Sequence, residues 1–450
     1  MFESKKGSNP KQTKTKKYTP LVLILVVILT LLLLLQAGKT FKKKAEPESQ
    51  KITLNYWGLF ESKEVMDELI NKYEKEHPNV DIIYEKRDFD DLGVYRATLL
   101  TRLQNKSGPA IFRLHSTWMS QYLNEVSFNN DSITNQDYTD RFYPVVKKQC
   151  VTNKGQMLCM PLMYDGLAMI YNKDLLARDS VSVPTTWEEL RSAALKLTRK
   201  SETGIVQAGV TLGTASNVRY ASDIFAFMLN QSNVGIPDGL DSEEGAAALD
   251  FYSNFSKMDK SWDNTMPDSI STFATEKAAI TFGTASSIRD IFSLNPTINL
   301  GVAPMPQLPV LGGGTTDDGW ANFWVESVSA DLSSDEQKAA WDFLEWMSRE
   351  DQQTQKYTLG VEKTGFGEIP ANKNLYQTFK GINYVGPIVT QAPKAKTLYL
   401  TDYAGNGEYV DIIKTAINSN VADKSDESLE VLKTAREAFT KLAKEKQSKN

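Results

Sequence analysis

The stretch from Lys51 to His115 alternates patterns typical of strands and helices. In chain order, strand, helix, strand, helix and strand patterns cover 51–57, 63–76, 80–84, 91–106 and 110–115. The strand patterns alternate apolar and polar side chains or are apolar throughout, and the helix patterns repeat apolar residues every three or four positions. Strand–helix–strand units of this length form parallel sheets that are buried between helices. The sequence therefore predicts an α/β fold for the part of the chain after residue 50.

An apolar run lies upstream of this region. From Leu21 to Leu35 every residue except Thr30 is a large aliphatic. Extended to 18–38, the run reaches about 20 residues, which is long enough to cross the hydrocarbon core of a bilayer. A Lys-rich segment (1–17) precedes it and a polar linker (39–50) follows. We therefore predict a single transmembrane helix that anchors the protein in the cell membrane, with the C-terminal body outside the cytoplasm. The alternative is a cleaved signal segment, which would leave the body secreted.

Composition and charge narrow the class of protein. The chain has 450 residues, of which 41% are hydrophobic and 24% charged, as in ordinary globular proteins. Ten Lys lie in residues 1–50, so residues 51–450 carry a net charge of −12. Such an acidic body is a poor match for a phosphate backbone, and we expect no nucleic-acid partner. With only two His and two Cys, we expect no metal site and no cofactor.

The two cysteines flank a short segment with a turn signal. Cys150 and Cys159 are separated by eight residues, with Lys154-Gly155 at the expected turn of a β-hairpin. In that register the two cysteines lie opposite each other, so we predict a cross-strand disulfide formed outside the cell. The alternative is a pair of buried free thiols. The spacing differs from the C-x-x-C of redox enzymes.

Other local signals mark helix starts and loops. Thr186 with Glu189 and Ser333 with Glu336 have the spacing of capping boxes, which begin helices. Residues 408–445 have the amphipathic spacing of two helices that are separated near 423–425. The three glycines at 312–314 lack the Lys-Ser/Thr of a phosphate-binding loop, so we interpret them as a surface loop.

Five segments in order resemble motifs of the extracellular solute-binding proteins of ABC importers, in the maltose-binding-protein-like group known as family 1. They are Tyr171–Leu176 followed by Pro184–Leu190, Phe273–Gly283, Gly301–Pro306, Trp341–Trp346 and Gly367–Asn372. The resemblance covers about residues 51–445. It departs from the family where Ala110 replaces an Asp, where Glu276 replaces a Gly, and where Thr284–Ser287 replaces an aromatic pair. The resemblance implies a monomeric protein without catalytic activity, which binds a small-molecule ligand, expected to be an oligosaccharide, and delivers it to the subunits of an ABC permease.

The resemblance also implies an architecture, a two-lobed periplasmic-binding-protein fold with crossing hinge strands. We expect crossings near 163–170, 279–283 and 328–334. The first lobe would then comprise 51–165 plus 284–332, and the second 166–283 plus 333–450. Ligand would bind in the cleft between the lobes, and hinge closure would enclose it.

Candidate ligand-binding residues follow from this cleft, since sugars are held by aromatic faces and by polar groups that bind hydroxyls. The candidates are Trp57, Ser116, Thr117, Trp118, Tyr164, Asp165, Tyr220, Thr284, Trp320, Trp324 and Glu408. The resemblance implies an acidic sugar contact at Asp165, the alternative being a carboxylate that caps a turn or helix. Of Trp320 and Trp324, we expect one to contact ligand and the other to pack in a core. Trp57 either lines the cleft or covers a core.

Three other functions remain open at this point. An extracellular carbohydrate-active enzyme would need two carboxylates that face each other across the cleft, and Glu61, Asp165 and Glu408 are the candidates. A sensor ectodomain would present the bound ligand to a signalling partner. A cationic ligand, such as a polyamine or an amino sugar, would suit the acidic residues of the predicted cleft.

Overall fold

The computed structural model describes Thr30 and residues 51–129, 132–401, 406–422 and 427–447. The predicted membrane anchor at 18–38, the basic segment and the linker lie outside the described residues, apart from Thr30. In the part of the chain that the structure describes, no helix is long and apolar enough to cross a membrane.

The first lobe is built on a four-stranded sheet in the order β10-β3-β1-β2. Its strands are β1 (Ile52–Gly58), β2 (Val80–Lys86), β3 (Ile111–His115) and β10 (Trp324–Val328). Its helices are α2 (Lys63–Glu76), α3 (Leu92–Gln104), η1 (Ser116–Trp118), α4 (Met119–Tyr122), α5 (Asn135–Arg141), α6 (Pro144–Cys150), α13 (Ser334–Met347), α14 (Glu350–Thr364) and η2 (Lys373–Leu375). Strand β1 pairs in parallel with β2 and β3, which confirms the predicted strand–helix–strand unit.

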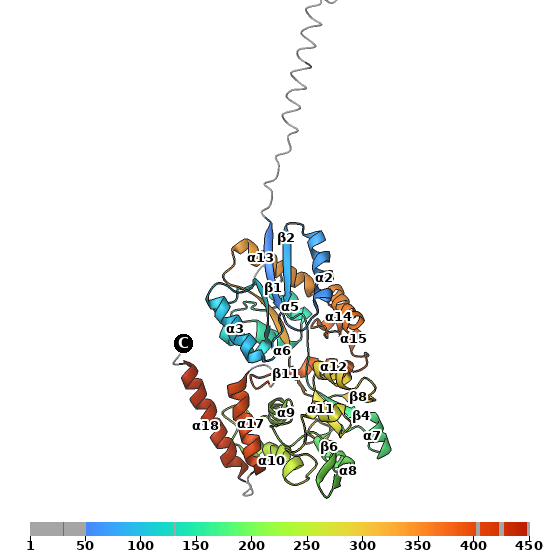
Figure 1. The fold of residues 1–450 in the computed structure, drawn as a ribbon. Coiled ribbons are helices and arrows are strands. Elements are labelled where there is room, and N and C mark those ends of the chain that lie inside the picture. The colour runs from blue at the N-terminus through green and yellow to red at the C-terminus, as the bar shows by residue number, and fades with distance from the viewer. Residues whose placement is uncertain (1–29, 31–50, 130–131, 402–405, 423–426, 448–450) are drawn as a thin grey trace, which may run out of the picture. The chain divides into compact units, whose positions relative to one another are not determined.

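The second lobe is built on a five-stranded sheet in the order β5-β6-β7-β4-β8. Its strands are β4 (Ala168–Asn172), β5 (Arg199–Ser201), β6 (Gly204–Val210), β7 (Ala278–Gly283) and β8 (Leu300–Ala303). Its helices are α7 (Lys173–Arg178), α8 (Trp187–Leu197), α9 (Ala221–Gln231), α10 (Glu243–Lys257), α11 (Ser269–Ala274), α12 (Ala285–Leu294), α17 (Gly407–Ala422) and α18 (Ser428–Gln447). Figure 1 shows α2, α3, α13 and α14 around β1 and β2, and the helices of the second lobe around β4, β6 and β8.

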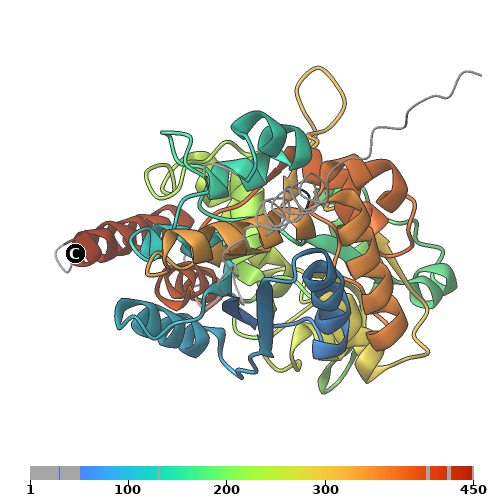
Figure 2. The ribbon, with the colours of Figure 1, turned by 90° about the horizontal axis from the view of Figure 1, so that it is seen from above.

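The local signals for helix starts are confirmed. The capping boxes at Thr186 and Ser333 begin α8 and α13, with each hydroxyl accepting the N–H three residues on and each Glu side chain accepting the N–H of the cap residue. The two predicted C-terminal helices are α17 and α18, which pack on each other and against α10. Figures 1 and 2 both place α18 at one side of the body. The loop at 312–314 is exposed, and its three glycines have positive φ.

The chain passes between the lobes three times. The first crossing lies before β4, the second between β8 and β10, and the third after α14. The second crossing contains β9 (Gly319–Trp320), and the third contains α15 (Tyr376–Phe379), α16 (Gly386–Gln391), η3 (Ala392–Lys394) and β11 (Ala395–Lys396). The crossings also pair with one another, because Gly166 bridges Ala321 and β11 pairs in parallel with β9. The hinge is therefore a set of paired backbone segments.

Two of the predicted crossings and the lobe boundaries are wrong. Strand β7 contains 279–283, and it lies between β6 and β4 in the second-lobe sheet. After β10 the chain does not cross near 328–334, since Ser333 immediately begins α13, which packs on β1 and β10. Within 284–332, α12 packs on α11 and β8 pairs with β4, so both belong to the second lobe. Within 333–450, α13 and α14 belong to the first lobe, where α14 packs on α2. Only the crossing expected near 163–170 agrees with the structure.

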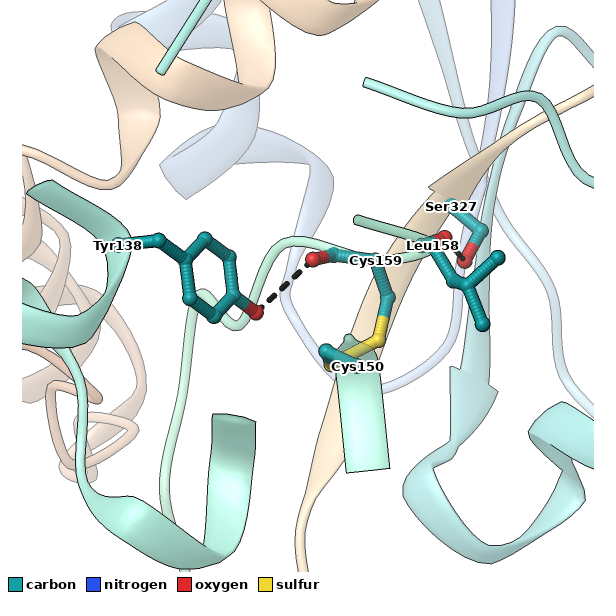
Figure 3. The surroundings of a disulfide bond; sticks show 5 residues. All are labelled: Tyr138, Cys150, Leu158, Cys159 and Ser327. Carbon is teal, nitrogen blue, oxygen red and sulfur yellow. Dashed lines mark hydrogen bonds between the residues drawn. A yellow bond between two sulfur atoms is a disulfide. The ribbon is translucent and has the colours of Figure 1, made fainter. Parts of the chain in front are cut away.

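The predicted disulfide is confirmed, but its setting differs from the predicted hairpin. Cys150 and Cys159 are bonded, with their Cα atoms 5.1 Å apart (Figure 3). Cys150 is the last residue of α6, and the bridge that follows pairs Val151 with Met157. The register is therefore shifted by one residue from the predicted one. The Tyr138 hydroxyl donates to the carbonyl of Cys159 at 3.0 Å, which holds Cys159 against α5.

Candidate ligand-binding site

A cavity of about 310 Å³ lies between the two lobes, and we call it the interlobe cavity. From the first lobe it is lined by Phe60, Glu61, Phe89, Asp90, Trp324, Phe366 and Glu368. From the crossings it is lined by Met163, Tyr164, Asp165 and Asn322. From the second lobe it is lined by Arg219, Tyr220, Thr284, Ala285, Ser286, Arg289 and Asp290. A solute in this cavity would therefore contact both lobes at once.

The first-lobe wall is aromatic. The rings of Phe60 and Trp324 meet edge to face with centroids 5.1 Å apart. Trp324 also packs on the rings of Trp118 and His115, with centroids 5.2 Å apart in each pair. These two rings hold that of Trp324 in one orientation. Phe60 follows β1 at its carboxyl end, where ligand-binding groups gather in parallel sheets. Such a wall suits the C–H faces of a sugar or another apolar surface.

Asp165 joins the first crossing to the start of α12. Its carboxylate accepts hydrogen bonds from the backbone N–H groups of Gly166 at 2.8 Å and Ala285 at 2.9 Å, and a longer one from Ser286 at 3.4 Å. Burial raises the pKa of Asp165 to about 7, although these N–H groups act in the opposite direction. Asp165 thus caps the start of a helix, which was the alternative considered for it from the sequence, and it also lines the cavity.

The second-lobe wall carries fixed charges and hydroxyls. Arg219 donates to the carboxylate of Asp290 at 2.9 Å. The hydroxyl of Tyr220 lies 3.3 Å from Thr284 Oγ1 and accepts from Ser287 at 3.1 Å. Tyr220 has a left-handed backbone with φ of 67°, which is uncommon for a residue with a side chain. Burial raises its pKa to about 12, so the hydroxyl keeps its proton.

A buried ionic network supports the first-lobe wall. Arg113 on β3 pairs with Glu326 at 2.7 Å and with Glu368 at 2.6 Å. Lys356 on α14 also contacts Glu368, and it lies 3.2 Å from Glu61. Burial and the negative charge of Glu368 raise the pKa of Glu61 to about 7. Burial opposes ionisation of Glu368 as well, but Arg113 and Lys356 hold its pKa well below the usual range. The two cavity-lining glutamates are thus held by cations from behind.

Five of the residues predicted from the sequence line the cavity. These are Tyr164, Asp165, Tyr220, Thr284 and Trp324. Of the Trp pair, Trp324 faces the cavity, whereas the indole N–H of Trp320 donates to Asp223 at 2.9 Å within the second lobe.

The other predicted residues do not line the cavity. The guanidinium carbon of Arg87 lies over the ring of Trp57, 4.3 Å from the ring centroid. Ser116, Thr117 and Trp118 form η1 behind the aromatic wall, with Ser116 and Trp118 buried. Glu408 is on the surface of α17, where it pairs with Lys446 at 2.7 Å. These positions follow a strand or begin a helix as expected, but their side chains point elsewhere.

Several lining residues were missed by sequence reasoning. Phe60 and Phe89 follow the carboxyl ends of β1 and β2, so their position after parallel strands was an available signal. Asn322 and Arg289 carry no such signal, because Asn322 lies within the second crossing and Arg289 lies in the middle of α12. Within the described residues, no group of three or more His, Cys, Asp or Glu is placed to hold a metal ion.

The sequence profile of the bacterial extracellular solute-binding proteins matches residues 68–397. The chain belongs to this family. The solute-binding protein therefore acts outside the cytoplasm, and its two lobes and interlobe cavity are those of a binding protein.

Solved structures share the fold of this solute-binding protein over most of its length. A solute-binding protein of an ABC transporter from Thermotoga lettingae, bound with α-D-tagatose, is 20% identical with a TM-score of 0.65, and the match covers 87% of this chain and 99% of that chain. The GacH receptor of Streptomyces glaucescens, solved unliganded and with acarbose, is 21% identical with a TM-score of 0.66, covering 87% and 98%. UgpB from Mycobacterium tuberculosis, in complex with glycerophosphocholine, is 16% identical with a TM-score of 0.69, covering 88% and 99%. A comparison with curated protein sequences gave no significant match.

Proposed function

We propose that this solute-binding protein captures an oligosaccharide in the interlobe cavity and delivers it to an ABC permease, as in the maltose-binding-protein-like group. The observation that carries the proposal is that both lobes line one cavity, with aromatic rings on one wall and charged and hydroxyl groups on the other. Stacking on rings and hydrogen bonds to polar side chains together select a sugar. The similar protein bound with acarbose supports an oligosaccharide, and the one bound with the monosaccharide tagatose supports a sugar more generally.

The proposal assigns contacts to the predicted residues that reach the cavity. Trp324 and Phe60 stack on the ligand. Tyr164, Tyr220 and Thr284 form the other walls around it. One oxygen of Asp165 accepts two short hydrogen bonds from N–H groups, while the other accepts the longer one from Ser286 and is the oxygen offered to a sugar hydroxyl. Closure of the lobes around the ligand is the signal that the permease recognises.

The proposal also includes the cellular setting. The protein is a monomer, tethered to the membrane through 18–38, with its body outside the cytoplasm. The disulfide between Cys150 and Cys159 supports an oxidising compartment for the body.

Isothermal titration calorimetry of the purified protein tests the ligand class. The panel contains maltotriose, maltotetraose, glycerophosphocholine and spermidine. We expect an oligosaccharide to bind and to remain intact on overnight incubation. A sugar that is cleaved would establish an enzyme instead, and binding of spermidine alone would establish the cationic ligand class.

Two tryptophan variants test the site itself. Trp324 is 7% exposed and lines the cavity, whereas Trp57 is 6% exposed and does not. We expect Trp324→Leu to weaken sugar binding about fivefold, since an aromatic stack contributes about 1 kcal/mol. Trp57→Leu removes the same ring at the same burial and should leave the affinity unchanged. Equal losses in both variants would place the ligand elsewhere.

A further inference from the structure

Asn322 lines the interlobe cavity and is held from behind by His115. The side-chain oxygen of Asn322 lies 3.1 Å from His115 Nε2, and its backbone N–H donates to the carbonyl of Asp165 at 2.9 Å. Asn322 is 9% exposed. Among the described residues, none accepts a hydrogen bond from its amide nitrogen. The chemistry that Asn322 offers the cavity therefore depends on which way its amide is turned.

The tautomer of His115 decides this orientation. The backbone N–H of Thr117 donates to His115 Nδ1 at 3.3 Å, and an N–H group can only donate. Nδ1 is therefore an acceptor, and in the neutral ring the proton lies on Nε2. Burial favours this neutral ring, since it lowers the pKa of His115 to about 4. Nε2–H must then face an oxygen, so the Asn322 NH₂ group is turned the other way.

The same chain of hydrogen bonds reaches the second lobe. Thr117 Oγ1 lies 2.8 Å from His115 Nδ1, and it accepts from the amide of Asn406 at 2.9 Å. Because Nδ1 is an acceptor, the Thr117 hydroxyl donates to it. Asn406 directly precedes α17, and its oxygen lies 3.4 Å from a guanidinium nitrogen of Arg96 on α3. In this series of hydrogen bonds each residue donates to the next, so the donor-to-acceptor direction runs from Asn406 to Asn322.

We propose that Asn322 binds the ligand as a fixed hydrogen-bond donor, and that Thr117 and His115 are positioning residues that hold its NH₂ group toward the cavity. This inference rests on the proposed function of the cavity. It makes the site selective for a solute with an acceptor oxygen at this point, such as a sugar hydroxyl or ring oxygen. Because Asn406 belongs to the other lobe, the orientation of the donor also depends on how the lobes are arranged.

Nitrogen NMR of the histidines tests the orientation without any ligand. The chain has only two His, so protein labelled with ¹⁵N-histidine gives two imidazole patterns, and His77→Gln assigns them. At pH 7 we expect His115 to show a protonated Nε2 and an unprotonated Nδ1. A protonated Nδ1 would mean that the Asn322 oxygen faces the cavity, which would overturn the inference.

Calorimetry with maltotriose tests the role in binding. Asn322→Asp keeps the shape and the acceptor toward His115 but removes the donor, and we expect an affinity at least tenfold weaker. Thr117→Val, which removes the hydroxyl, should weaken binding severalfold and shift the Nδ1 signal, whereas Thr117→Ser, which keeps the hydroxyl, should restore both.

If the wild-type protein binds maltotriose and Asn322→Asp binds it equally well, the inference is wrong while the proposed function stands. If the wild-type protein binds no oligosaccharide, the proposed function fails, and the tautomer of His115 still decides the direction of the hydrogen-bond chain.

Discussion

The carboxylate of Asp165 accepts a hydrogen bond from the backbone N–H of Ala285 at 2.9 Å, which ties the first crossing to the first turn of α12. The N-terminal N–H groups of a helix carry partial positive charge and favour an anion. Burial has the larger effect, so the pKa of Asp165 rises to about 7. The same carboxylate therefore couples the hinge, the cavity wall and the pH dependence of stability.

Asp165→Asn should change how stability depends on pH. The folded-state pKa of about 7 lies above the usual 3.8, so the folded protein holds the proton more tightly than the unfolded chain does. The stability contributed by the neutral carboxyl is therefore complete below pH 4 and is lost as the pH rises through 7. Between pH 4 and 8 we expect the unfolding free energy of wild type to fall relative to that of the variant by up to about 4 kcal/mol.

Urea denaturation at pH 4, 6 and 8 measures this difference. Asp88→Asn is the control, because its side chain is 80% exposed beside Lys86. The difference between this control and wild type should stay nearly constant with pH. A constant difference for Asp165→Asn as well would show that the buried carboxyl stays ionised throughout.

Gly166 should tolerate no side chain. A Cβ at this position would lie 2.6 Å from the backbone oxygen of Trp320, where the first and second crossings pair. We expect Gly166→Ala to reduce the unfolding free energy by about 1–3 kcal/mol, because the paired backbones must separate. Gly381→Ala is the matched control, since a Cβ there meets no atom within 4 Å. Thermal denaturation of both variants checks the prediction, and equal melting temperatures would contradict it.

Local sequence signals predicted the helix starts and the parallel strands well. The α/β pattern of 51–115 and the capping boxes at Thr186 and Ser333 depend on residues close together in the chain. The path between lobes depends instead on which strands pair, and pairing partners such as β4 and β8 are more than a hundred residues apart. An apolar strand such as β7 has the same sequence pattern whether it crosses between lobes or lies within one sheet. For this reason two crossings were misplaced.

The candidate site shows the same limit. Asp165 and Trp324 reach the cavity as predicted, because each lies at the end of a strand or crossing segment. Trp118 follows β3 in the same way, but its ring packs behind Trp324. The sequence places a residue on an element, whereas the packing of neighbouring rings decides which aromatic faces the solute. Asn322 is identified only from the structure, by its place in the cavity wall and by its contact with His115.

Removing Lys356 should destabilise the protein strongly. Its side chain is 2% exposed and contacts both Glu61 and Glu368, so its loss leaves two buried carboxylates with one cation fewer. We expect Lys356→Met to lower the unfolding free energy by about 3–5 kcal/mol. Lys63→Met is the control, because Lys63 pairs with Asp67 on the surface of α2 and such pairs contribute at most about 1 kcal/mol. Urea denaturation that gave equal losses for the two variants would show that the network adds nothing beyond a surface pair.

Reduction of the disulfide should lower stability without changing the fold. Cys150 and Cys159 are nine positions apart, and closing so short a loop in the unfolded chain is worth about 3 kcal/mol or less. We therefore expect a reductant to shift the urea midpoint of wild type downward. The double variant Cys150→Ser/Cys159→Ser should unfold near the reduced midpoint and should not respond to reductant.

Thiol alkylation followed by mass spectrometry of the protein as isolated tests the bond directly, because two alkylated cysteines without reductant would contradict a disulfide. A wild-type midpoint that reductant leaves unchanged would mean instead that α6 and the segment before β4 are held by their packing alone, with Tyr138 keeping Cys159 in place.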